Sequence, residues 1–112
     1  MPKNKSPVID DTGTKHWYNK RGQLHRLDGP AIIFTDGAES WYKNGKRHRI
    51  GGPSGSWPNG GQCWYQNDKL HRLDGPAFID EYGTEEWWIN GKEVEPIPNI
   101  ICILRRKLNE KS

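Results

Sequence analysis

Apolar and polar residues recur along the chain with a period of 23 or 24 residues. In the first and third periods, a Trp-led aromatic pair is followed by a polar stretch, a His-Arg pair and an Asp-Gly-Pro-Ala segment. The two clearest columns are Trp17, Trp41, Trp64 and Trp87, and His25, His48 and His71. Columns that keep one period indicate tandem structural repeats. We assign repeats to residues 12–35, 36–58 and 59–81, and a half-repeat to residues 82–96.

Each repeat contains two turn signals. The pairs Asn44-Gly45 and Asn90-Gly91 suit two-residue hairpin turns, which need positive φ at both central positions. The second signals are Asp36-Gly37, Asn59-Gly60 and Tyr82-Gly83. Strand, turn, strand and turn in succession predict a mainly-β protein, an antiparallel β-meander of about seven or eight strands built from hairpins.

The turns also predict which side chains share a face of the sheet. A two-residue turn at 44–45 pairs Tyr42 with Arg47 and Trp41 with His48. Residues that pair across two strands point to the same face of the sheet, so Trp and His share one face. Because side chains alternate along a strand, their neighbours Tyr and Arg point to the other. A two-residue turn at 36–37 places Ile32 opposite Trp41, and the same count places Phe78 opposite Trp87, so the Trp face is the predicted core. The opposite face is predicted to carry Tyr18, Tyr42, Tyr65, Arg47 and the row Arg26, Arg49 and Arg72.

The two ends of the chain differ from the repeats. We expect residues 1–11 to form a flexible N-terminal arm. Residues 97–112 are predicted to form a short C-terminal α-helix, since Asn99 could cap it and apolar residues follow at nearly helical spacing. Such a helix would cover the sheet or dock a second copy of the chain.

Composition limits the core and the setting. Hydrophobic residues make up 32% of the chain, against roughly 45–50% in an average globular protein, so six Trp residues would have to supply a thin core. Cys63 and Cys102 lack the spacing of a disulfide framework or a zinc site. The chain has no apolar signal core and no long apolar run. We therefore expect a cytoplasmic protein without a membrane partner.

Catalytic chemistry finds no support in the sequence. Successive repeats place the three column histidines roughly 10 Å apart, which is too far for them to share one metal ion. No nucleophile elbow, Walker loop or HExxH motif occurs. We expect no enzymatic activity, no catalytic residues, no metal and no cofactor.

The basic residues are the candidate binding chemistry in a chain of net charge +3. Arg26 and Arg72 each have an Asp two residues later, whereas Arg49 has Gly51 there and is free to bind an external carboxylate or phosphate. The small residues at 51–56 predict a concavity beside Trp57 where a nucleotide could stack. The predicted partner-binding residues are Tyr42, Lys43, Lys46, Arg47, Arg49, Trp57, Arg26, Arg72 and Tyr65.

The consensus W-Y-x-N-G-K-x-H-R-x-D-G-P-A over residues 12–96 resembles the MORN-like tandem repeats of small phage proteins. The second repeat departs from it with Gly51 and Ser54, and the half-repeat has Val94 in place of His. The resemblance implies a single-layer twisted meander used as an interaction platform, in some proteins touching phospholipids. By association it implies a phage protein that blocks a host defence system.

Two classes of function stay open. The first is a protein-binding module, a phage-type inhibitor that binds a host protein or ribonucleoprotein complex, as anti-CRISPR proteins do. The alternative is binding of nucleic acid or an anionic nucleotide through the Tyr/Arg face. A phospholipid-surface scaffold would need stronger basic clustering. A homodimer could form through the exposed edge of residues 82–96 or through the C-terminal helix.

Overall fold

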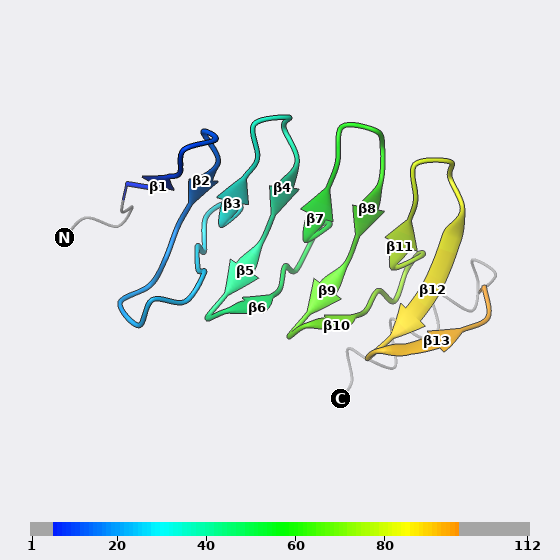
Figure 1. The fold of residues 1–112 in the computed structure, drawn as a ribbon. Helices are drawn as coiled ribbons and strands as arrows, with labels where there is room; N and C mark the ends of the chain where they lie inside the picture. The colour runs from blue at the N-terminus through cyan, green and yellow to red at the C-terminus, as the bar shows by residue number, and fades with distance from the viewer. Residues whose placement is uncertain (1–5, 97–112) are drawn as a thin grey trace.

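A computed structural model describes residues 6–96 and shows a row of side-by-side hairpins (Figure 1). In this part of the chain, nine strands form one antiparallel sheet and two hairpins form separate two-stranded sheets. The large sheet runs in the order β1 (Val8–Ile9), β2 (Lys15–His16), β3 (Ile32–Ile33), β4 (Glu39–Ser40), β7 (Gly55–Ser56), β8 (Gln62–Cys63), β11 (Phe78–Ile79), β12 (Glu85–Ile89) and β13 (Lys92–Val94). The separate hairpins are β5 (Tyr42–Lys43) with β6 (Lys46–Arg47), and β9 (Tyr65–Gln66) with β10 (Lys69–Leu70). The predicted mainly-β antiparallel meander is confirmed, with more and shorter strands than expected.

The two-residue turns form where the sequence predicts them. Asn44 and Gly45 have φ values of 50° and 82°, and Asn90 has a φ of 50°. Asp68 also takes a positive φ, of 68°. These turns fix the predicted pairing of Tyr42 with Arg47.

Successive hairpins are joined to one another by backbone hydrogen bonds. The N–H groups of Arg26, Arg49 and Arg72 donate to the carbonyls of Tyr42, Tyr65 and Trp88, at 3.1 Å each. Each hairpin therefore lies against the next one, as Figure 1 shows. The repeats stack along one axis because every hairpin satisfies part of its neighbour's backbone.

The second turn of each repeat has a different length from the one expected, and this corrects the register. Phe34 N–H donates to Ala38 O at 2.9 Å, so the loop has three residues, ending in Gly37 with a φ of 96°. A three-residue hairpin loop places a left-handed residue in that third position. As a result, Ile32 pairs with Ser40 rather than Trp41, and Phe78 with Glu86 rather than Trp87.

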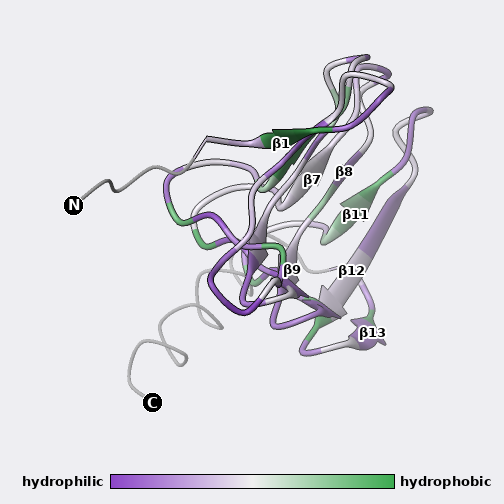
Figure 2. Cartoon of the chain, turned by 60° about the vertical axis from the view of Figure 1, so that its left-hand side comes forward, coloured by the Kyte–Doolittle hydropathy of each residue, from purple (hydrophilic) through white to green (hydrophobic). Residues whose placement is uncertain are grey.

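The one-residue shift moves these side chains to the other face. Ile32 and Phe78 therefore lie on the face that carries Tyr42 and Tyr65, which we call the Tyr face. The prediction that they thicken the Trp face was wrong. The described buried residues are mostly small, and they are Thr14, Gly29, Ala31, Ile32, Ala38, Ser54, Gly55, Gly61, Cys63, Gly75 and Ala77. The column tryptophans are half-buried. In cross-section the molecule is thin, with principal extents of 45 × 34 × 19 Å, and its hydrophobic stretches are short, as at β1 and β11 in Figure 2.

The two predictions for the ends of the chain have different outcomes. Val8–Ile9, within the expected flexible arm, form β1 and pair with β2. The predicted C-terminal helix lies outside the described residues. Among the described residues, no helix has the length and apolar character needed to cross a membrane.

Candidate functional site

The Trp face carries a three-layer stack in each of the first three repeats. The Cζ atoms of Arg26, Arg49 and Arg72 lie 4.0, 3.9 and 4.0 Å from the ring centroids of Trp17, Trp41 and Trp64. This corrects the prediction that the arginine row lies on the Tyr face. The regular strands end at Arg47 and Leu70, so strand alternation counted from the hairpin no longer holds at Arg49 and Arg72.

The glycine that precedes the proline in each of these repeats forms the third layer of the stack. A Cβ atom on Gly52 would lie 2.8 Å from Arg49 Cζ, and the equivalent atom on Gly75 would lie 2.7 Å from Arg72 Cζ. The Nη1 group of Arg49 then donates to Pro53 O at 3.0 Å. Each guanidinium is thus held between an indole ring and a glycine backbone, a cation–π arrangement. This role for the arginine row is structural.

The histidine column links each repeat to the next. His25, His48 and His71 accept hydrogen bonds through Nδ1 from the backbone N–H groups of Asn44, Asn67 and Asn90, at 2.9, 3.1 and 3.0 Å. An Nδ1 atom that accepts a hydrogen bond carries no proton. Burial lowers the pKa of both His48 and His71, and nearby Lys43 lowers that of His48 further.

We expect mild acid to loosen the repeat array. Because the pKa of His48 and His71 lies below the ordinary 6.5 in the folded protein, the unfolded chain binds more protons as the pH falls through this range. The free energy of unfolding is therefore highest above about pH 6.5 and falls below it. Urea titrations at pH 7.5 and 5.5 measure this loss. The double variant His48→Gln, His71→Gln should show a smaller loss, and an equal loss in both proteins would contradict the assignment.

The Tyr face centres on Arg47, which lies between two repeats. Its Cζ atom lies 4.0 Å from the ring centroid of Tyr65, and its Nε atom donates to Asp68 Oδ1 at 2.9 Å. The backbone N–H of Arg47 donates to the same oxygen at 3.0 Å. These hydrogen bonds from Arg47 lower the pKa of Asp68. Arg47 is therefore held in place by the next repeat.

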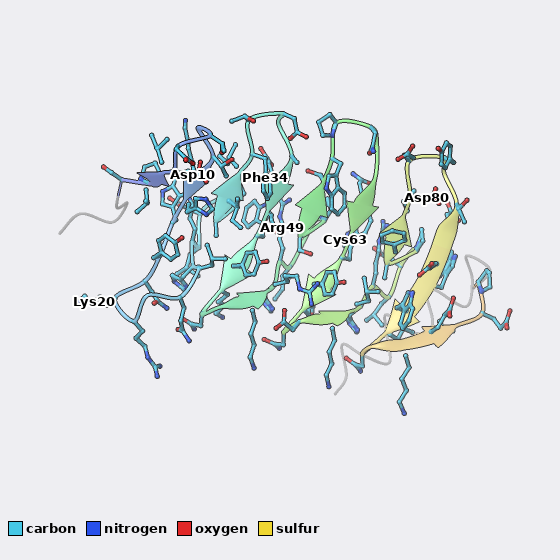
Figure 3. All side chains as sticks on the ribbon, in the orientation of Figure 1. Asp10, Lys20, Phe34, Arg49, Cys63 and Asp80 are labelled. Carbon is cyan, nitrogen blue, oxygen red and sulfur yellow. The ribbon has the colours of Figure 1, made fainter. Side chains whose placement is uncertain are left out.

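A cavity of about 230 Å³ lies beside Arg47, and the expected concavity next to Trp57 is thus present. Its lining residues are Phe34, Glu39, Ser40, Arg47, Gly55, Trp57, Cys63, Tyr65 and Phe78. Figure 3 labels Phe34, which directly follows β3, and Cys63, which is the last residue of β8. We call this cavity the aromatic pocket.

The aromatic pocket exists because one repeat lacks a large side chain. Gly55 occupies the position that Ile32 and Phe78 occupy in the neighbouring repeats. Its Cα also faces Cys63 closely, since a Cβ atom on Gly55 would lie 2.7 Å from Cys63 Sγ. Burial raises the pKa of the Cys63 thiol, so Cys63 is a packing group at the pocket floor rather than a nucleophile.

The predicted binding residues fall into separate groups. Arg47, Trp57 and Tyr65 line the aromatic pocket. Arg49 and Arg72 line a second cavity on the Trp face, which Trp64 also lines. Tyr42 lies opposite Arg47, and Lys43 and Lys46 form an exposed pair beside the hairpin turn. Arg26 is held on Trp17 in the first repeat.

Sequence reasoning missed Phe34, Cys63 and Phe78 as pocket residues and Asp68 as the partner of Arg47. The signal that could have predicted the pocket is the small residue Gly55 at the repeat position where the neighbouring repeats have Ile32 and Phe78. Asp68 gave no local signal, because it lies 21 residues from Arg47 along the chain.

Within residues 6–96, no group of three His, Cys, Asp or Glu side chains is placed to hold a metal ion. Comparison of the chain with protein-family models, with curated proteins and with solved structures returns no match. The argument for function therefore depends on the two cavities and their side chains.

Proposed function

We propose that this chain is a non-enzymatic protein-binding module, and that the aromatic pocket receives an aromatic side chain of the partner. The supporting observation is the pocket itself, where the aromatic side chains of Phe34, Trp57, Tyr65 and Phe78 surround Gly55. At about 230 Å³, the pocket is smaller than the roughly 300–1,000 Å³ typical of small-molecule sites. Its size suits one anchoring side chain.

The chemistry of the pocket favours a protein over a nucleic acid. Aromatic residues and arginine are enriched at the centres of protein interfaces. Trp57 and Phe34 are 44% and 41% exposed and can contact a partner without unfolding. The charge of Arg47 is already paired with Asp68, and Glu39 also lines the pocket. A phosphate backbone would meet little free positive charge here.

Trp57→Ala tests this proposal. Loss of a central aromatic anchor at an interface should weaken partner binding by roughly thirtyfold. The tagged wild-type protein and the variant are used to capture partners from a nuclease-treated bacterial lysate, and the affinity for the captured protein is then measured. Leu27→Ala is the matched control, since Leu27 is 72% exposed and does not line the pocket.

The outcomes separate the candidate functions. A stoichiometric protein captured by wild type and Leu27→Ala, but not by Trp57→Ala, supports the proposal. Equal capture by all three proteins would overturn the pocket assignment. A partner that is lost with nuclease, or nucleic acid alone, would replace the proposal with the nucleic-acid alternative.

The resemblance to MORN-like phage repeats extends the proposal to a biological role. We propose that the chain inhibits a host defence complex by direct binding in the host cytoplasm. The captured partner identifies the complex. β13 is the last strand of the large sheet, so pairing of two copies through this edge would appear as a dimer in sedimentation of the purified protein.

A further inference from the structure

The three arginine stacks on the Trp face differ in one respect. In the first repeat Arg26 Nε donates to Asp28 Oδ1 at 3.2 Å, and in the third repeat Arg72 Nε donates to Asp74 Oδ1 at 3.2 Å. In the second repeat Gly51 replaces the aspartate. Among the acidic side chains of residues 6–96, none forms an ion pair with Arg49.

The remaining geometry of Arg49 matches its two counterparts. Its guanidinium lies 3.9 Å from the Trp41 ring centroid and donates to Pro53 O at 3.0 Å. The corresponding Arg26 values are 4.0 Å and 3.2 Å. Indole, glycine and proline thus hold Arg49 in the orientation in which Arg26 and Arg72 bind a carboxylate. The side chain is pre-organised for a carboxylate that its own repeat does not supply.

Among residues 6–96, nothing fills the space beside Arg49. A Cβ atom built on Gly51 would meet no atom of these residues within 4 Å, and the φ of 94° at Gly51 directs the chain differently from the aspartates of the other repeats. Arg49 lines a cavity of about 590 Å³ that reaches the stack of the third repeat. The other lining residues are Ile50, Gly51, Gly52, Pro53, Trp64, Gln66, His71, Arg72, Leu73 and Asp74.

We propose that this cavity binds an acidic side chain of a protein or peptide, whose carboxylate takes the place on Arg49 Nε that Asp28 and Asp74 take in the other repeats. Asp74 is paired with Arg72, so Arg49 adds net positive charge to the cavity. Ile50, which is 74% exposed, and Leu73 supply apolar surface beside it. A carboxylate flanked by apolar residues fits this combination better than a small free acid does. The site faces away from the aromatic pocket and does not depend on it.

Titration of the arginine Nε–H signals by NMR tests the proposal. The probe is the capped peptide acetyl-Leu-Asp-Leu-amide, and the controls are acetyl-Leu-Asn-Leu-amide, sodium acetate and inorganic phosphate. We expect the Arg49 signal to shift saturably with the Asp peptide and to stay unchanged with the Asn peptide. Acetate should bind roughly tenfold more weakly or worse, since it lacks the apolar contacts. Arg49→Lys assigns the signal by removing it.

The other two stacks act as internal controls. The Arg26 and Arg72 signals should not move, because the Nε–H groups of these arginines are already bound by Asp28 and Asp74. Asp28→Ala should create a second site, so that the Arg26 signal begins to shift with the same peptide. This gain remains observable even if substitutions near Arg49 disturb folding.

Three results would overturn the inference. The first is an Arg49 signal that does not respond to the Asp peptide while the protein is folded. The second is an equal response of all three arginines in the wild-type protein, which would indicate non-specific screening. The third is tighter binding of phosphate than of the peptide, which would assign the cavity to phosphorylated ligands.

Discussion

Trp64→Ala should lower the free energy of unfolding by about 3 kcal/mol, near the lower end of the range for removal of a buried Trp. Trp64 is half-buried, and its ring supports the guanidinium of Arg72 at 4.0 Å. Without the ring, Arg72 loses one layer of its stack and the third repeat loses the centre of its Trp face. Urea denaturation followed by far-ultraviolet circular dichroism measures the loss.

Two further variants separate the stack from general loss of apolar surface. Trp64→Phe keeps an aromatic face under Arg72 and should cost about 1 kcal/mol, less than the alanine variant. Trp57→Ala should also cost roughly 1 kcal/mol, because Trp57 is 44% exposed and so loses only part of a full burial term. Equal losses in Trp64→Ala and Trp57→Ala would show that the arginine stack contributes little to stability.

Gly55→Ala should destabilise the protein by about 2 kcal/mol, within the range for overpacking a tight site. The added Cβ atom would lie 2.7 Å from Cys63 Sγ, and Cys63 is itself buried in β8. The two strands β7 and β8 are hydrogen-bonded neighbours and cannot separate freely. Thermal and urea unfolding of the variant measure the cost.

Cys63→Ala should relieve the same contact. In the background of Cys63→Ala, which removes the sulfur atom, Gly55→Ala should cost little or nothing. The double-mutant cycle should therefore give a coupling energy of about 2 kcal/mol. Additive effects of the two substitutions would contradict the contact and would indicate that β7 moves aside.

Both candidate sites arise where the second repeat departs from its neighbours. Gly55 replaces the Ile32 and Phe78 of the adjacent repeats and opens the aromatic pocket on one face. On the other face, Gly51 replaces Asp28 and Asp74, so that Arg49 forms no ion pair with a carboxylate of residues 6–96. A regular array supplies the rigid frame, and the irregular repeat supplies the space for ligands.

The sequence alone determined the features that depend on neighbours along the chain. The repeat period, the two-residue turns and the pairing of Tyr42 with Arg47 follow from turn chemistry within a few residues. The ion pairs of Arg26 with Asp28 and of Arg72 with Asp74 join residues two positions apart, a spacing that is visible in the sequence.

Only the tertiary structure decided how the repeats face and join one another. One extra residue in the Phe34–Ala38 loop moved Ile32 to the other face, because strand side chains alternate with a period of two. The histidine bonds to the turn asparagines and the bond from Arg47 to Asp68 cross 19 and 21 residues. Such lateral contacts exist only after neighbouring hairpins have stacked, and no local pattern in the sequence specifies them.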